Sequence, residues 1–273
     1  MSSVFITRSE GIVYDLDELG YKVKKFDFPS TNYSYSMQQE GTFGNKIVNT
    51  SAGELTLTLT LKVVATDNYD FELKRFELNR IFSSYDYFWI SSVRFPYLQW
   101  KVKASPFTME QVDNAPYTDV SISLVCDEGF AESVGTTADD DFTFSAGKWG
   151  LANYLPNGEG LKYIFVNQNK FKVYNASVIP LRADERPVDI IFNGNVKNKL
   201  TIKNNTTNQS VSYNRSLSKD KTLTIHGLVP IEDNQQMYYA SDHGFIDFTV
   251  GWNELEVVGA SDFTIKFRTK FYY

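Results

Sequence analysis

Strict alternation of apolar and polar residues is the feature that most constrains the fold of this chain. In GELTLTLTLKVVA, residues 53–65, every second residue from Leu55 to Val63 is apolar, and the residues between them are threonine or lysine. This period of two is that of a β-strand with one buried face. The alternation recurs at 98–102 and 120–126, so the first half of the chain is predicted to be built on a β-sheet.

The second half contains shorter strand patterns, which continue to the last residue. Beyond residue 180 they are separated by turn residues at 193–194, 226–227, 251–253 and 259. Short strands at this spacing favour a β-sandwich. In the closing DFTIKFRTKFYY, apolar residues recur at alternate positions. These side chains are predicted to face the core of the second domain: Phe263, Ile265, Phe267, Phe271 and Tyr273.

One segment has helical periodicity instead. DNYDFELKRFELNRIFSS, from Asp67, lacks Gly and Pro and places Phe71, Leu78 and Phe82 on one stripe. Asp67 or Asn68 can cap its start. Leu73 and Phe76 lie off the stripe, which suggests a helix packed on two sides while covering one side of the sheet.

Two polar stretches separate these patterns. The first, 31–54, is too long for a tight hairpin and is expected to be an extended arm or loop. The second, 131–150, is poor in aliphatic residues and reads as a connector between domains.

Charge and composition restrict the class of protein. The net charge is −6, and residues 1–130 carry 12 basic and 17 acidic side chains, so neither half is a basic platform for nucleic acid. Cys126 is the only cysteine, which excludes an intrachain disulfide. There is no secretory signal pattern and no apolar run of about 20 residues, so a soluble protein folded in a reducing cytoplasm is expected.

Candidates for chemistry are few, and each has a structural interpretation. His226 and His243 belong to no motif, and Cys126 lies in a strand pattern that favours burial. Ser216 and Lys219 match Ser-x-x-Lys, but that spacing needs a helix and the segment reads as a turn. Three adjacent aspartates, 139–141, lack the alternating ligand spacing of calcium loops. No catalytic, cofactor-binding or metal-binding residue is therefore expected.

Two tryptophans leave a carbohydrate-binding alternative open. Trp149 follows the connector and Trp252 lies in a turn, and an exposed tryptophan beside a sandwich can stack on a sugar ring.

The order of weak motifs along the chain resembles the distal tail (Dit) proteins of siphophages. The resemblance spans EGIVYDLDELGYKVKKFDFP, the arm with EGTFGNK, the Leu/Thr strand, KRFELNRIF, FPYLQWKVKASP, RPVDIIFNGN and the closing FTVGWNELEVVGASDFTIKFRTKFYY. At 251–253 the chain has Gly-Trp-Asn where many members have a Pro-Gly-x-Asn turn.

The resemblance implies a mainly β, non-enzymatic virion protein of two domains. Residues 1–130 would be an N-terminal ring-forming β-domain with one α-helix and an extended arm. Residues 131–273 would be a C-terminal galectin-like β-sandwich, with 131–150 as connector. The implied function is a hexameric hub at the virion tail tip, assembled in the bacterial host cytoplasm. It would join the tail tube protein, a tail-associated tip protein and receptor-binding or baseplate proteins, while genomic DNA passes through without specific binding. The alternative is a monomeric carbohydrate-binding module used for host attachment.

Overall fold

The computed structural model describes residues 3–111, 115–138, 142, 147–156 and 160–273. The chain divides into two compact units, Met1–Glu132 and Ser133–Tyr273. Among the described residues, regular structure consists of β-strands, one α-helix and short 3₁₀ turns. The expectation of a mainly β protein with one helix is confirmed.

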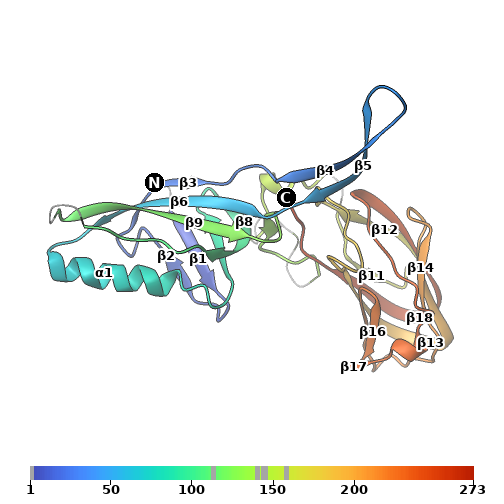
Figure 1. Cartoon of the computed structure of the whole chain (residues 1–273). Coiled ribbons are helices and arrows are strands. Elements are labelled where there is room, and N and C mark those ends of the chain that lie inside the picture. The colour runs from blue at the N-terminus through green and yellow to red at the C-terminus, as the bar shows by residue number, and fades with distance from the viewer. Residues whose placement is uncertain (1–2, 112–114, 139–141, 143–146, 157–159) are drawn as a thin grey trace. The chain divides into compact units, whose positions relative to one another are not determined.

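The first unit is built on a sheet whose strands follow the order β2-β1-β7-β8-β9-β6-β3 (Figure 1). A separate hairpin, β4–β5, belongs to the same unit. The bounds are β1 Val4–Arg8, β2 Val13–Asp15, β3 Lys22–Asp27, β4 Tyr33–Gln39, β5 Asn45–Ala52, β6 Leu55–Val64, α1 Asn68–Ile81, β7 Phe88–Ser92, β8 Phe95–Ala104, β9 Tyr117–Cys126 and β10 Glu132–Ser133.

The Leu/Thr strand β6 lies inside this sheet rather than at its edge. It pairs with β9 along its whole length, from Leu55 opposite Cys126 to Val64 opposite Tyr117, and with β3 on its other side. The alternation predicted from the sequence is present, because the leucines are buried and most of the threonines are partly exposed. Because β3 pairs with residues 58–62 only, the middle of β6 has a neighbouring strand on each side.

The helix α1 covers part of the first unit with one face only. Asp67 caps its start by accepting a hydrogen bond from the Asp70 backbone N–H at 2.7 Å. Phe71, Leu78 and Phe82 are buried, as their spacing predicts. The expectation of packing on a second side is wrong within the single chain, since Leu73 and Phe76 are 51% and 69% exposed.

The second unit is a β-sandwich organised by two long strands, β13 and β18. The bounds are η2 Leu151–Asn153, β11 Ile164–Val166, β12 Lys170–Asn175, β13 Asp189–Asn204, β14 Gln209–Tyr213, β15 Leu223–His226, β16 Val229–Glu232, β17 Gln235–Gln236, η3 Tyr238–Ala240 and β18 Gly251–Arg268. At one end of the β13–β18 pair, the sheet extends from β13 through β15, β16 and β17, and β11 pairs with β18. At the other end, β12 pairs with β18 and β14 pairs with β13. Both ends contribute to one hydrophobic core.

Three positions expected to be turns lie inside these long strands instead. Residues 251–253 form the start of β18 and pair with residues 173–175 of β12. Residues 193–194 fall within β13 and Gly259 falls within β18, at interruptions of the ladder between the two strands. At Gly259 φ is +88°, and a Cβ atom would lie 2.1 Å from the Lys199 carbonyl oxygen. Glycine therefore permits the close approach that lets one strand bend without ending. The sequence shows the glycine but not whether the chain reverses there.

The chain terminus is held in the second unit, as its alternation predicts. Phe263, Ile265 and Phe267 are at most 2% exposed, and Phe271 is completely buried. Beyond the end of β18, the Phe271 carbonyl accepts from the Ser133 N–H at 2.8 Å, and its own N–H donates to Ser133 Oγ at 3.0 Å. The last residues thus complete the core rather than fray.

Replacing Phe271 by alanine should destabilise the second unit by about 3–5 kcal/mol, because the change leaves a cavity in a closed core. Thermal and urea unfolding of the full chain would measure this. Phe245→Ala is the matched control, because Phe245 is 42% exposed in the same unit and should cost clearly less. Equal losses for the two variants would contradict the placement of the terminus.

Candidate assembly surface and polar sites

The hairpin β4–β5 separates apolar and polar side chains onto two faces. Its register pairs Tyr35 with Thr50 and Met37 with Ile47, with a bulge at Val48 between the two pairs. Because side chains alternate across a strand, Tyr33, Tyr35 and Met37 share a face with Ile47. The opposite face carries mainly serine, asparagine and glutamine.

Neither face of this hairpin is covered by the other described residues of the chain. Every residue of β4 and β5 is exposed, and the four side chains of the apolar face range from 42% to 59% exposed: Tyr33, Tyr35, Met37 and Ile47. Among the described strands, β4 and β5 pair only with each other. The extended arm expected from the sequence is present, and it takes the form of a paired hairpin (Figure 1). The alternation of Tyr33, Tyr35 and Met37 was the signal that could have revealed it.

The base of the hairpin is fixed to the first unit. Gly53 donates to the Asn32 carbonyl at 2.8 Å and closes the two strands. Gly129 approaches this base so closely that a Cβ atom there would lie 2.4 Å from the Gly53 carbonyl oxygen, and its φ is +73°. Thr31 Oγ1 adds a hydrogen bond to the Gly129 carbonyl at 3.3 Å. A rigid base therefore presents a fully exposed pair of strands.

The outer face of α1 presents a second exposed apolar stripe. Tyr69, Leu73 and Phe76 are spaced i, i+4 and i+7 and are at least 51% exposed. Helical periodicity identified Leu73 and Phe76 as lying off the buried stripe, but a single sequence could not show that they stay exposed among the residues that the structure describes.

The two tryptophans proposed as sugar platforms lie in different surroundings. Trp149 is 3% exposed and packs in the core, with its ring centroid 4.5 Å from that of Phe142. Its indole face is therefore not available for stacking. Trp252 is partly buried and makes an edge contact with Tyr174, at 5.1 Å between centroids. The structure does not bring the two tryptophans together into one platform.

Each histidine takes part in a local contact on the surface. His226 Nδ1 lies 2.5 Å from Asp189 Oδ1, and the other carboxylate oxygen of Asp189 accepts from Arg268 Nη2 at 3.0 Å. His243 adopts φ of +62° in a turn, and its ring lies on that of Tyr238 with centroids 4.3 Å apart. The two histidines are not brought into a common site with Cys126.

Two further candidates, Cys126 and the Ser216–Lys219 segment, lack the geometry of a nucleophilic site. Cys126 is fully buried, and burial raises the pKa of its thiol, which is the opposite of what a nucleophile needs. The segment from Ser216 to Lys219 is not helical, and Lys219 Nζ pairs with Asp262 at 2.7 Å. The aspartates at 139–141 lie outside the described residues. Within the described ranges, no group of three or more His, Cys, Asp or Glu side chains is placed to hold a metal ion. No described helix is long and apolar enough to cross a membrane.

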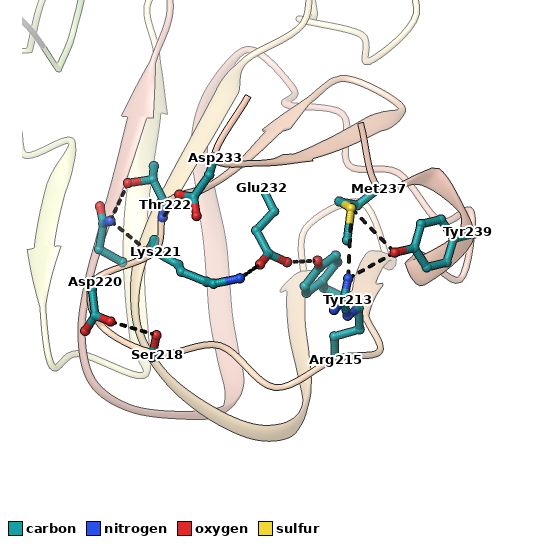
Figure 2. Close-up of polar contacts among 11 residues, drawn as sticks. Tyr213, Arg215, Ser218, Asp220, Lys221, Thr222, Glu232, Asp233, Met237 and Tyr239 are labelled. Carbon is teal, nitrogen blue, oxygen red and sulfur yellow. Dashed lines mark hydrogen bonds and ion pairs between the residues drawn. The ribbon is translucent and has the colours of Figure 1, made fainter. Parts of the chain in front are cut away.

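A buried carboxylate forms a connected polar site in the second unit (Figure 2). Glu232, at the end of β16, is 5% exposed and accepts hydrogen bonds from the Tyr213 hydroxyl and the Lys221 ammonium. Arg215 Nη1 donates to the Tyr239 hydroxyl at 3.0 Å beside this pair. No short sequence motif links these residues, so sequence reasoning did not find them.

This cluster holds its members in defined protonation states. The hydrogen bond from Lys221 has the largest effect and the bond from Tyr213 the next largest, and together they keep the pKa of Glu232 below its ordinary value. Burial, with the bond to Glu232 as a further cause, raises the pKa of Tyr213. At neutral pH the site is thus a carboxylate held between a neutral phenol and an ammonium group. Its role is to join β14, the approach to β15, and the end of β16.

The comparison of sequence families gives a match in the first unit. Residues 10–126 match the model of the phage tail protein RIFT-related domain. The match begins just after β1 and ends with β9, so it includes α1 and the hairpin. Among curated proteins, no sequence matches this chain.

The comparison of solved structures extends the likeness to the whole chain. The Dit protein of phage SPP1, described as a paradigm of the hub adsorption apparatus in phages that infect Gram-positive bacteria, superposes with a TM-score of 0.71. The sequences are 11% identical, and the superposition covers 99% of each chain. This chain has the fold of a distal tail protein. A chain of the phage P2 baseplate, in its activated conformation with Ca, matches with a TM-score of 0.50 at 7% identity and covers 98% of each chain. The resemblance predicted from the sequence is confirmed, and these matches are named as tail or baseplate proteins rather than as enzymes.

Replacing Glu232 by glutamine should lower stability at pH 7 by about 2 kcal/mol, the scale of a hydrogen bond to a charged group. The pKa of Glu232 is lower in the folded state than in the unfolded state. Its contribution to folding stability is therefore complete above about pH 4.3, the ordinary pKa of glutamate, and is lost as the pH falls through the folded-state pKa. The deficit of Glu232→Gln should therefore shrink on acidification.

Urea unfolding of the full chain at a series of pH values would test this. Glu254→Gln is the control, because Glu254 forms an exposed pair with Lys172 and should change little at any pH. A deficit for Glu232→Gln that is independent of pH would contradict the proposed state of the carboxylate.

Proposed function

We propose that this chain is a structural distal tail protein of a phage virion. It assembles into a hexameric ring at the tail tip and joins the tail tube to the baseplate and receptor-binding apparatus. Support comes from the tail-protein domain at residues 10–126 and from the Dit fold of the whole chain. In this proposal residues 1–130 build the ring, and residues 131–273 form the outer sandwich.

The observation that carries the proposal is the uncovered hairpin β4–β5. An isolated two-stranded hairpin is at best marginally stable in water, yet this one exposes a face of Tyr33, Tyr35, Met37 and Ile47. Its unpaired outer edges are also surfaces that a lone domain would need to protect. Contact with a neighbouring copy would bury the apolar face and satisfy the edges. A hairpin that docks on a different surface of the next copy gives a head-to-tail contact, which closes into a ring when the rotation permits.

The charge of the first domain suits a ring that surrounds DNA without gripping it. With 12 basic and 17 acidic side chains, residues 1–130 carry a net charge of −5. A basic lining would hold phosphates through counterion release and slow the passage of the genome. In the proposed virion, the second domain is left to contact receptor-binding or baseplate proteins, and assembly takes place in the host cytoplasm.

Replacing Tyr35 and Ile47 by serine should weaken self-association without unfolding the chain, because both side chains are more than half exposed in the single copy. Light scattering over a concentration series, followed by negative-stain imaging of large species, would measure the effect. Wild-type protein should give a ring with a central opening. Ser34→Ala with Ser36→Ala, on the polar face of the same hairpin, is the matched control and should assemble normally. Unchanged assembly of the Tyr35/Ile47 variant would contradict the role of the apolar face.

The assembled protein should bind duplex DNA more weakly than a typical non-specific DNA-binding protein, with a Kd above about 10⁻⁴ M at physiological salt. A mobility-shift titration with linear duplex DNA would measure this. Binding tighter than about 10⁻⁶ M, with a strong salt dependence, would contradict a passive channel.

A further inference from the structure

An open pocket lies on the second unit, where β12 pairs with the first half of β18. Its volume is about 400 Å³, within the range of about 300–1,000 Å³ that is usual for small-molecule sites. Phe171 and Leu255 line it and are buried, so they form its floor. The rest of the lining is polar and consists of Lys170, Lys172, Asn205 and Glu254. The pocket therefore has an apolar floor and a rim of hydrogen-bonding groups.

The strand register places the rim on the outer face of the sheet. Lys172 lies opposite Glu254, and the two side chains are paired at 3.0 Å. Asn205 follows β13 on the other side of Glu254, since its N–H donates to the Glu254 carbonyl at 2.8 Å. The Glu254 N–H in turn donates to Thr206 Oγ1 at 2.9 Å. These backbone bonds fix the rim, so the pocket is preformed.

An aromatic pair continues the same face of the sheet. Tyr174 lies opposite Trp252, two residues along each strand from Lys172 and Glu254. Because side chains alternate across a strand, the four side chains point to the same side, with about 7 Å between the two pairs. Trp252 and Tyr174 are both partly exposed, and their ring centroids lie 5.1 Å apart. An aromatic surface thus adjoins the polar rim.

The charges of this face do not favour a ligand of one sign. Lys170 lies 3.7 Å from Glu256, and Lys203 is opposite Glu256 on β13. Together with the pair of Lys172 and Glu254, the face carries three ammonium groups and two carboxylates, a net charge of +1 over five side chains. That charge gives a polyanion little attraction, and an apolar ligand would cover polar groups without bonding them.

The chemistry of a neutral sugar matches both parts of the site. Each sugar hydroxyl can donate to a carboxylate and accept from an ammonium or amide group, and the rim presents all three groups side by side. The C–H face of a sugar ring is apolar and can pack on an aromatic ring. Because an exposed ion pair contributes little to stability, Lys172 and Glu254 can exchange their mutual contact for hydroxyl groups at small cost.

We propose that this face binds a neutral glycan. One sugar ring packs on Trp252 beside Tyr174, and the next ring lies over the pocket, where its hydroxyls bond to Lys172, Asn205 and Glu254. The inference goes beyond the structural role proposed above and does not depend on ring formation, since every residue of the site belongs to the second unit. In the proposed virion, the site would give the hub a direct contact with surface carbohydrate.

Saturation-transfer NMR of the full chain tests the site with four neutral disaccharides as probes: lactose, maltose, cellobiose and chitobiose. We expect at least one of them to bind with a Kd in the millimolar range or tighter. The protons on one face of a sugar ring should receive the most saturation, because that face lies on Trp252. Trp252→Ala should weaken binding by about 10-fold. Tyr239→Ala is the aromatic control, because Tyr239 is 74% exposed elsewhere in the same unit.

A second variant separates binding from folding, because Trp252 also packs on Tyr174. Glu254→Gln should leave stability unchanged and weaken binding by about 5-fold, since hydrogen bonds to an ionised acceptor are about twice as strong as neutral ones. Glu185→Gln is the matched control. Glu185 also forms an exposed pair, with Arg182 at 3.6 Å, but it precedes β13 instead of following it, and its variant should bind like the wild type.

The outcomes decide the proposal whether or not the chain assembles. Binding that is weakened in Trp252→Ala and Glu254→Gln, and normal in both controls, supports it. No saturation of any of the four probes by the wild type overturns it, as do equal losses in the site variants and their controls. Binding of a heparin disaccharide in place of the neutral probes overturns the assignment of a neutral ligand. Light scattering measures assembly separately, and all four variants should assemble like the wild type.

Discussion

The second unit depends on the pairing of its two long strands. β13 and β18 run antiparallel from Asp189 opposite Arg268 to Asn204 opposite Leu255, with interruptions near 194 and between 196 and 201. The strands β11 and β12 attach to β18, while β14 and β15 attach to β13. Because both long strands bend without ending, one ladder serves both ends of the sandwich. The bend at Gly259 is thus a condition for the fold rather than a local detail.

The first unit uses its strands in the opposite way, because it leaves one pair outside its sheet. β6 is enclosed by β3 and β9, and its leucines supply the core. The hairpin β4–β5, which directly precedes β6 in the chain, gains no burial from its own copy. The cost of ordering about twenty residues is therefore not offset within the single chain. Assembly offsets it in the proposed ring, and the exposed stripe of α1 remains available for a further contact.

The buried polar groups of the second unit are hydrogen-bonded to nearby side chains and backbone. Glu232 has its carboxylate bonded by Tyr213 and Lys221, so its burial is compensated. Asn253 is completely buried near the start of β18, where its side chain accepts from the Thr249 N–H at 3.0 Å and donates to the Thr249 carbonyl at 2.8 Å. The chain keeps this asparagine from the Pro-Gly-x-Asn pattern of the family, and its amide ties the start of β18 to the segment before it.

The sequence by itself determined the alternating strands, the capped helix and which of the last residues are buried. These patterns are local: they repeat every two residues in a strand and every three to four in a helix. It also limited the chemistry, since two histidines and one cysteine leave few combinations. Tertiary structure decided that Gly259 bends a strand instead of ending it, that the middle of β6 has a neighbouring strand on each side, and that Trp149 lies in a core. It also showed that residues 33–52 pair as a hairpin with one apolar face uncovered. Each of these features depends on which distant segments come into contact, for example Gly259 with Lys199. Such contacts produce no periodic pattern in a single sequence.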